Sequence, residues 1–208
     1  GRSIEYYAEA AEALAVLVGR HDQPGGIVAL EVNLSCPNLA GKSMFAHDAP
    51  AAAQVMAATA VAGLPRWAKL SPNTDRLVQV ATACAEAGAD AVTLTNTLLG
   101  LVIDIETRRP VLGGGGGGVS GPGMGPIAVR AVWDVARALP QLPIIGAGGV
   151  CDADSAIQLL MAGASAVQVG TATFADPRAP QRVLDDLTRW CHDHGVTSVA
   201  ELCGASHR

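Results

Sequence analysis

The chain has 208 residues, which suits one domain, and half of them are hydrophobic, so there is ample material for a buried core. Charged residues account for 16% and the formal net charge is −5, so the chain lacks the basic character needed to follow a phosphate backbone. No apolar run reaches membrane-spanning length, and the chain does not open on a signal-peptide pattern. We therefore expect one globular domain that has neither nucleic acid nor a membrane as partner.

The predicted elements alternate along the chain. Helices are predicted over residues 4–18, 48–63, 75–89, 125–140, 152–165 and 178–194. Strands are predicted over residues 26–35, 66–71, 90–97, 142–149 and 166–171. Such alternation is typical of right-handed βαβ units that build a parallel sheet. Both a doubly wound sheet and a barrel fit this pattern.

The residues that end the predicted strands favour a barrel. Polar residues or glycines stand at all five carboxyl ends: Asn33, Lys69, Asn96, Gly148–Gly149 and Gly170–Thr171. An open sheet concentrates its site at one switch point, whereas a barrel gathers every strand end around one mouth. We therefore predict the (β/α)8 TIM-barrel class. A closed barrel needs eight strands, so we expect residues 1–208 to be the C-terminal part of a single barrel domain, with strands four to eight only.

A run of six glycines, Gly113–Gly118, lies in the long segment between the third strand and the next helix. We interpret it mainly as a flexible loop. The alternative is a mobile cover over the site. No strand leads directly into the run, so it does not have the context of a phosphate-binding loop.

The ends of the last two strands are the expected phosphate site. Gly148, Gly149, Gly170 and Thr171 each precede a helix, and barrels commonly bind phosphate in the loops after these two strands. A tight turn that needs glycine is the alternative explanation at each position. Two such ends on consecutive strands favour a ligand that carries a phosphate.

Polar side chains at the first three strand ends suggest a planar ligand. Lys69 lies mid-strand among apolar neighbours, and a buried lysine needs a partner. An ion pair with Glu31, which alternation places on the same face as Asn33, would satisfy it. The same lysine would lie under a ligand that gains negative charge. The amides of Asn33, Asn38 and Asn96, together with Thr97, suit a small heterocycle with carbonyl and N–H edges, although each alone is more often a cap or turn residue.

Cys36 follows the first strand in the polar segment "NLSCPN". A lone cysteine is usually inert packing, but in a polar loop it can act as a nucleophile or a general base. No histidine is near it in sequence except His47, eleven residues on, so a protease-like pair is disfavoured. The other four cysteines are irregularly spaced, which argues against a disulfide framework and favours a reducing, cytoplasmic setting. The "CHDH" segment would not converge on a metal at helical spacing, so we predict no metal site.

Several segments, taken in order, resemble a known family. They are "NLSCPN", "KLSPN", "TLTNTLLG", "VSGPGMGPIAVR", "PIIGAGGV", "MAGASAVQVGTATF" and the terminal "GASHR". The ordered set is similar to the class 1 dihydroorotate dehydrogenases, most of all to the type 1B catalytic subunit, over nearly the whole chain. The resemblance implies an FMN-containing (β/α)8 barrel that oxidises dihydroorotate to orotate in pyrimidine synthesis. It also implies that the N-terminal third of the family's chain, with three strands, would precede residue 1.

The resemblance implies roles for the residues that face the substrate. Cys36 would be the general base that removes a proton from C5 of dihydroorotate, while the hydride from C6 passes to N5 of FMN. Asn33 would contact both FMN and substrate. Asn38, Asn96 and Thr97 would hold orotate.

The remaining matched residues would surround the flavin. Lys69 would lie beside its ring and stabilise the anionic reduced form. Thr95 and Gly121 would line the ring. The phosphate end would be held by Gly148, Gly149, Gly170 and Thr171.

Type 1B enzymes pass electrons to NAD through a partner subunit that carries FAD and an iron–sulfur cluster, whereas type 1A enzymes use fumarate. The resemblance therefore implies an electron-transfer partner and a homodimer or heterotetramer. Two alternatives stay open. One is a related FMN barrel such as a dihydropyrimidine dehydrogenase, in which we expect histidine where this chain has Asn38. The other is a catalytically inactive barrel fragment that binds no FMN.

Overall fold

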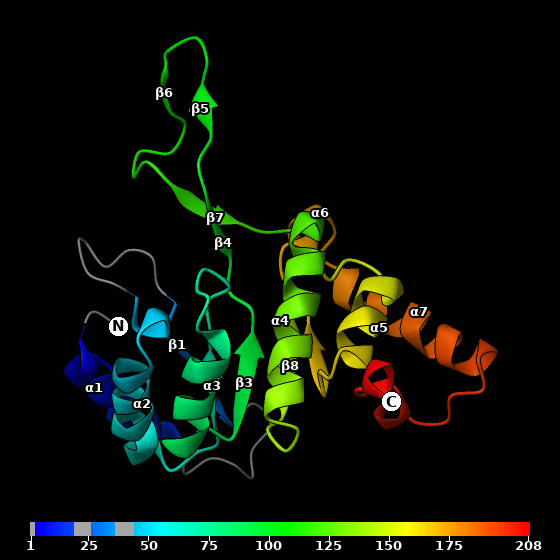
Figure 1. The fold of residues 1–208 in the computed structure, drawn as a ribbon, viewed down its shortest axis with the longest axis horizontal. Coiled ribbons are helices and arrows are strands. Elements are labelled where there is room, and N and C mark those ends of the chain that lie inside the picture. The colour runs from blue at the N-terminus through cyan, green and yellow to red at the C-terminus, as the bar shows by residue number, and fades with distance from the viewer. Residues whose placement is uncertain (1–2, 19–25, 36–43) are drawn as a thin grey trace.

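The computed structural model describes residues 3–18, 26–35 and 44–208 (Figure 1). Its centre is a five-stranded sheet in the order β1-β2-β3-β8-β9, and all neighbouring pairs are parallel. The strands are β1 (Leu30–Asn33), β2 (Arg66–Lys69), β3 (Ala91–Leu94), β8 (Ile144–Ala147) and β9 (Ala166–Gln168). Each lies inside a predicted strand but is shorter. The predicted alternation and the parallel pairing are confirmed.

The helices also follow the predicted order, apart from the short α6, which was not predicted. They are α1 (Ile4–Val18), α2 (Ala49–Ala58), α3 (Leu77–Glu86), α4 (Gly125–Ala138), α5 (Ala153–Met161), α6 (Ala172–Ala175) and α7 (Ala179–Asp193). Side-chain caps fix several starts: the Asp48 carboxylate accepts from Ala51 N–H, and Asp152 forms a capping box with Ser155. None of the described helices is both long and apolar enough to cross a bilayer.

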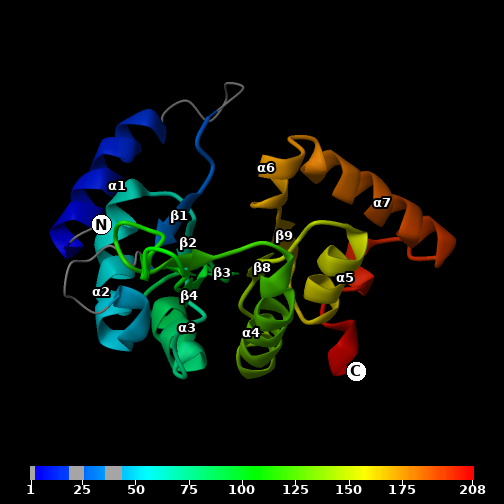
Figure 2. The ribbon, with the colours of Figure 1, turned by 90° about the horizontal axis from the view of Figure 1, so that it is seen from above.

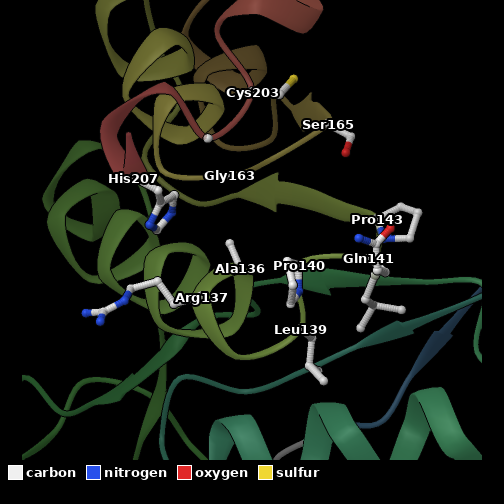
Figure 3. A pocket seen from close by; sticks show the side chains of 12 residues that line it. Ala136, Arg137, Leu139, Pro140, Gln141, Pro143, Gly163, Ser165, Cys203 and His207 are labelled. Carbon is white, nitrogen blue, oxygen red and sulfur yellow. The ribbon is translucent and has the colours of Figure 1, made fainter.

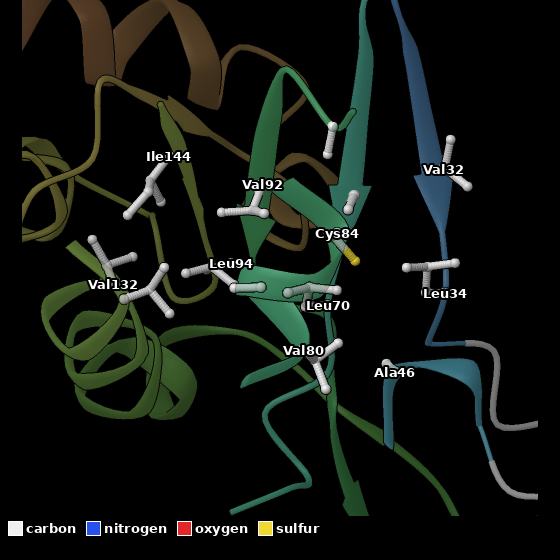
Figure 4. Close-up of a cluster of buried hydrophobic side chains, with 14 of the residues drawn as sticks. Val32, Leu34, Ala46, Leu70, Val80, Cys84, Val92, Leu94, Val132 and Ile144 are labelled. Carbon is white, nitrogen blue, oxygen red and sulfur yellow. The ribbon is translucent and has the colours of Figure 1, made fainter. Parts of the chain in front are cut away.

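The main core lies between the sheet and its helices (Figure 4). Alternate strand residues face the helices, and these include Val32, Leu34, Leu70, Val92, Leu94 and Ile144. They pack against α2, α3 and α4, whose contributions include Met56, Val80, Cys84 and Val132. Burial raises the pKa of Cys84 to about 12, so this thiol is an inert packing group.

The other face of the sheet carries polar side chains and curves inward. Glu31 on β1 and Gln168 on β9 belong to the two outermost strands, yet Gln168 Nε2 donates to Glu31 Oε2 at 2.8 Å. Figure 2 shows the helices in an arc around the outer side of this curved sheet. A doubly wound sheet would carry helices on both faces. The arrangement is therefore that of a partial (β/α) barrel.

The segment between β3 and α4 differs from the prediction. It forms an arm of two antiparallel pairs, which rises from the body in Figure 1. The pairs are β4 (Leu98–Gly100) with β7 (Gly117–Val119), and β5 (Ile103–Asp104) with β6 (Arg109–Pro110). The glycine run is thus not one loop, because its last two residues pair with β4.

Close packing explains these last glycines. A Cβ atom added to Gly118 would come within 2.4 Å of Thr97 Oγ1, and one on Gly117 within 2.5 Å of Leu112 Cδ1. Gly113, Gly114 and Gly115 would meet nothing within 4 Å. Interpreting the whole run as a flexible loop was therefore wrong for Gly117 and Gly118, where the backbone must pass close to other groups.

Candidate functional site

A pocket of about 430 Å³ lies at the carboxyl ends of the strands. Its volume is in the range of small-molecule sites. Nine of the predicted site residues line it: Lys69, Thr95, Asn96, Thr97, Gly121, Gly148, Gly149, Gly170 and Thr171. Asn33 reaches this group through a hydrogen bond to Asn96. Cys36 and Asn38 lie outside the described residues.

Lys69 and Glu31 form the predicted ion pair. Lys69 Nζ lies 2.8 Å from Glu31 Oε1, and the two side chains are 23% and 25% exposed. The second carboxylate oxygen accepts from Thr93 Oγ1 and from Gln168 Nε2, each at 2.8 Å. One carboxylate thus joins β1, β2, β3 and β9 inside the partial barrel.

These contacts set the charge of Glu31. Burial alone would raise its pKa, but hydrogen bonds from Lys69, Gln168 and Thr93, with the lysine charge, outweigh that effect and lower the pKa below its usual value. The carboxylate is therefore ionised at neutral pH. Thr93 and Gln168 were not predicted. They lie 62 and 137 positions from Glu31, and only the fold brings them to it.

The asparagines at the ends of β1 and β3 support one another. Asn96 Nδ2 donates to Asn33 Oδ1 at 3.0 Å, and the same oxygen accepts from Ser35 N–H. Asn96 Oδ1 accepts from Thr97 N–H at 2.8 Å, so the amide orientation is defined on both sides. Tyr7 on α1 donates its hydroxyl to Asn33 O at 2.5 Å and holds the strand end from outside.

Asn73 is a supporting residue that the sequence reasoning missed. Its Nδ2 donates to Ser71 Oγ and to Thr97 O, and its Oδ1 accepts from Leu99 N–H at 2.8 Å. It therefore connects the end of β2 to the start of the arm. An Asn two residues after a serine that ends a strand is a turn signal, which could have pointed to it.

The glycines predicted at the phosphate end differ in their surroundings. Gly149 has a φ of +81°, and an added Cβ would come within 2.5 Å of Gly125 N and Cα, so the start of α4 requires glycine there. A Cβ on Gly170 would meet nothing within 4 Å, although Gly170 lines the pocket. Gly121 faces Thr171, with 3.7 Å between its added Cβ and Thr171 Cγ2. The packing explanation thus accounts for Gly149 and leaves Gly170 free to face a ligand.

Thr95 carries a buried hydroxyl. Its residue is 4% exposed, and its Oγ1 makes no hydrogen bond to any other described residue. Thr95 lies in the pocket wall, next to Gly148. A buried hydroxyl without a partner costs free energy, so one in the wall of a pocket of this size suits a ligand that has a hydrogen-bonding edge.

Two further pocket residues bring charge or a thiol. Arg182 Nε pairs with Asp176 Oδ2 at 3.2 Å at the start of α7. Cys151 follows β8, where partial burial and the neighbouring Asp152 carboxylate raise the pKa of its thiol. Neither was predicted as a site residue. The signal for Cys151 was its place two residues after Gly149.

A second pocket of about 540 Å³ lies at the opposite ends of β8 and β9 (Figure 3). Residues just before these strands, such as Pro143 and Ser165, line it together with Arg137 and His207. The His207 ring stacks on Trp133 at 3.9 Å and contacts Ala162 O, so it is held by the protein itself. The pocket contains none of the predicted site residues. Among the described residues, no three His, Cys, Asp or Glu side chains gather as a metal site would require.

Fold and site together define a (β/α)-barrel protein with a small-molecule pocket at the carboxyl ends of its strands. The family model for dihydroorotate dehydrogenase matches residues 7–190, and the chain belongs to that family. This confirms the resemblance inferred from the sequence.

Curated relatives carry the same family name. The chain is 47% identical over 204 residues to the protein named dihydroorotate dehydrogenase B (NAD(+)), catalytic subunit, from Pelobacter propionicus, covering 97% of this chain and 67% of that one. It is 48% identical over 202 residues to the protein of the same name from Desulforudis audaxviator, covering 96% and 66%. The chain thus spans about two thirds of the length of these relatives.

A solved structure supports the fold. The crystal structure of DHODH from Eimeria tenella in complex with ferulenol superimposes with a TM-score of 0.73 at 21% identity. The match covers 99% of this chain and 68% of that one. It therefore supports the partial-barrel architecture.

Proposed function

We propose that this chain contributes the FMN pocket and the orotate-binding amides of an enzyme that oxidises dihydroorotate to orotate in pyrimidine synthesis. The observation that carries the proposal is the gathering of nine predicted residues around one pocket. Seven of these residues are predicted from their place at strand ends, and the resemblance alone predicts Thr95 and Gly121. The nine come from four separate strand ends and the Gly121 turn. Membership of the family supports the same assignment.

The described residues fit FMN. The Thr95 hydroxyl, which has no partner among the described residues, offers a hydrogen-bond donor. The space at Gly170 leaves room for a phosphate-bearing tail, and the Lys69 ammonium offers a positive charge. We infer that Lys69, Thr95 and Gly121 face the ring. The phosphate end would be held by Gly148, Gly149, Gly170 and Thr171. Bound FMN would supply the two-electron acceptor for the hydride from dihydroorotate.

The chain's own residues would do the rest. Asn33, Asn96 and Thr97 would orient the carbonyl and N–H edges of the substrate. The side-chain amides of Asn33 and Asn96 are already fixed by a hydrogen bond between them, and Asn96 also accepts from the backbone N–H of Thr97. With Asn38 they form the set proposed to hold orotate. Cys36 would accept the proton from C5. Lys69, already held by Glu31, would place its charge at the pocket wall.

A partner subunit forms part of the proposal. The relatives are named NAD(+)-type catalytic subunits, which favours an electron-transfer partner over direct reduction of fumarate. We infer that this partner carries FAD and an iron–sulfur cluster. The two subunits would form a heterotetramer, and the enzyme would act in the cytoplasm. A homodimer without the partner is the other assembly that the resemblance allows.

The test uses the complete reading frame that contains this chain. We expect the purified protein to be yellow, and anaerobic dihydroorotate to bleach its flavin absorbance. Dihydrouracil, the substrate expected for a dihydropyrimidine dehydrogenase, should leave the absorbance unchanged. Bleaching by dihydrouracil alone would replace the proposal with that related activity.

Substitution of the proposed base is a sharper test. We expect Cys36→Ser to slow flavin reduction by dihydroorotate at neutral pH by about 10²-fold or more, because a serine hydroxyl is a far weaker proton acceptor. Stopped-flow absorbance gives the rate, and the matched control is Cys203→Ser, which lies in the second pocket and not in the candidate site. An unchanged reduction rate in Cys36→Ser would remove the general-base role.

The isolated 208-residue chain tests the second candidate, an inactive fragment. In the described part of the chain, β1 and β9 each pair on one side only. We expect this chain alone to bind FMN weakly or not at all. A stoichiometric flavin spectrum from the chain alone would overturn that expectation.

A further inference from the structure

Glu31 stands out because it does not line the pocket, yet it contacts two residues that do. Its carboxylate accepts from Lys69 and Gln168, both of which line the pocket, and from Thr93 on the strand between them. Such a set of donors fixes both oxygens of the carboxylate. Glu31 therefore fixes the position of the Lys69 ammonium.

Lysine is rare in this chain. Lys69 is one of two lysines in the sequence, the other being Lys42. Among described residues that line the pocket, the only other side chain that carries a permanent positive charge is Arg182, and Asp176 pairs with it. Glu31 likewise offsets the Lys69 charge at 2.8 Å. Each of the two cationic side chains in the pocket wall is thus paired with a carboxylate, which weakens its electric field in the pocket.

A carboxylate behind Lys69 has two physical effects. It restricts the flexible lysine side chain to one direction, because the ammonium is bonded to an acceptor that is itself held by Thr93 and Gln168. It also weakens the positive field at the pocket wall, because two opposite charges in contact act at a distance as a dipole. Thr93 and Gln168 would satisfy an uncharged acceptor equally well, so the negative charge itself serves Lys69.

We propose that Glu31 is a positioning residue that holds the Lys69 ammonium against the flavin and, by partly neutralising it, limits how strongly the site favours reduced FMN. The proposal rests on the proposed function for its flavin part. The part that concerns Lys69 stands on the ion pair alone.

Three variants of the full-length protein test it. Glu31→Gln removes the charge while keeping the shape. Thr93→Val removes one hydrogen bond to Glu31 and leaves the Glu31–Lys69 pair, so it is the matched structural control. Glu31→Asp keeps the charge but withdraws it by one methylene, and it serves if Glu31→Gln does not fold.

Two readouts separate positioning from general stability. The first is the midpoint potential of bound FMN, measured by dye-coupled reductive titration. We expect a more positive potential in Glu31→Gln, because the Lys69 charge is no longer offset, and an unchanged potential in Thr93→Val. The second needs no flavin: the rate at which acetic anhydride modifies Lys69, with Lys42 as the internal reference, read by peptide mass spectrometry. We expect Lys69 to react several-fold faster in Glu31→Gln and in Glu31→Asp, and at the wild-type rate in Thr93→Val.

The outcomes are distinct from failure of the proposed function. If dihydroorotate does not bleach the wild-type flavin, the proposed function fails, while the Lys69 labelling still decides whether Glu31 holds the lysine. Equal labelling of Lys69 in the wild type and both Glu31 variants would overturn the proposal. Equal potentials in wild type and Glu31→Gln would remove its electrostatic part, even in an enzyme that oxidises dihydroorotate. A shift of the same size in Thr93→Val would reduce Glu31 to a structural role.

Discussion

At the scale of the residue, the Thr95 hydroxyl lowers the stability of the ligand-free fold and is suited to binding a ligand. Its hydroxyl is buried in the pocket wall without a partner among the described residues. Threonine in that position makes the folding free energy less favourable than the isosteric valine would, because the hydroxyl loses its hydrogen bonds to water on burial and makes none within the described part of the protein. A ligand that bonds to the hydroxyl would recover that free energy.

We expect Thr95→Val to raise the unfolding free energy of the ligand-free protein by about 1 kcal/mol. The same substitution should weaken FMN binding several-fold, since the hydroxyl is then missing. Urea denaturation and fluorescence titration with FMN measure the two effects. Loss of stability together with unchanged FMN affinity would show that the hydroxyl has a partner within the protein.

Residue by residue, the sequence predicted the site well where a local signal existed. Lys69, Asn96 and Gly170 could be found because each lies at a strand end or two residues beyond it, and strand ends share a mouth. The pair of Glu31 and Lys69 followed from alternation and from the cost of burying a charge. Thr93 and Gln168 could not be found as partners, because alternation fixes a face of the sheet and says nothing about which distant side chain completes a hydrogen bond.

At the scale of the element, the turns after β8 and β9 look alike in sequence and differ in structure. The turn after β8 is packed against the start of α4, at Gly125. The turn after β9 opens onto the pocket at Gly170. The first glycine is therefore required for folding, and the second is available for a ligand.

We expect Gly149→Ala to lower the unfolding free energy by about 2 kcal/mol or more, because its methyl group would meet Gly125 and its φ is positive. Gly170→Ala is the matched control, with a change within about 0.5 kcal/mol. Its methyl group would narrow the pocket, so its FMN affinity should fall. Thermal unfolding and FMN titration of both variants distinguish these effects, and equal destabilisation would contradict the distinction.

The arm shows why some elements were not predicted. Helices and parallel strands have periodic apolar patterns of four residues or more, which the sequence displays. The arm strands have two or three residues each and consist largely of glycine and exposed side chains. Their pairing depends on the close approach of backbones, which composition alone describes as a loop.

At the scale of the whole molecule, Glu31 connects the first and last strands of the sheet. Its bond to Gln168 bridges β1 and β9, while Lys69 and Thr93 tie in the two strands next to β1. The curvature that makes this sheet part of a barrel thus has a specific polar contact at its centre. The fold class was predictable because alternation indicated a parallel sheet and the polar strand ends favoured a barrel, but this bridge was not.

The bridge predicts a pH dependence. The pKa of Glu31 is lowered in the folded chain, so the unfolded chain takes up its proton at a higher pH. The contribution of Glu31 to stability is therefore fully present above the ordinary value of 4.5 and is lost as the pH falls through the lower folded value. We expect the difference in unfolding free energy between wild type and Glu31→Gln to be constant from pH 7 to about 5 and to shrink below 4.5.

Urea denaturation of both proteins between pH 7 and pH 3 measures this difference. Comparison with Glu31→Gln is needed because other carboxylates have lowered pKa values, such as Asp152 and Asp176. Their protonation in acid also lowers the unfolding free energy of the protein. Those groups act equally in both proteins and cancel. A difference that persists unchanged to pH 3 would mean that the pKa of Glu31 is the same in the folded and unfolded chains.

The divided glycine run has a practical consequence for anyone who wants to observe this protein. Gly117 and Gly118 must remain bare, because side chains there would press on Leu112 and Thr97. Gly113 and Gly114, a few residues away, have open space around them. A side chain introduced at one of these two positions would extend into open space, so the arm can carry a reporter residue there without pressing on Leu112 or Thr97.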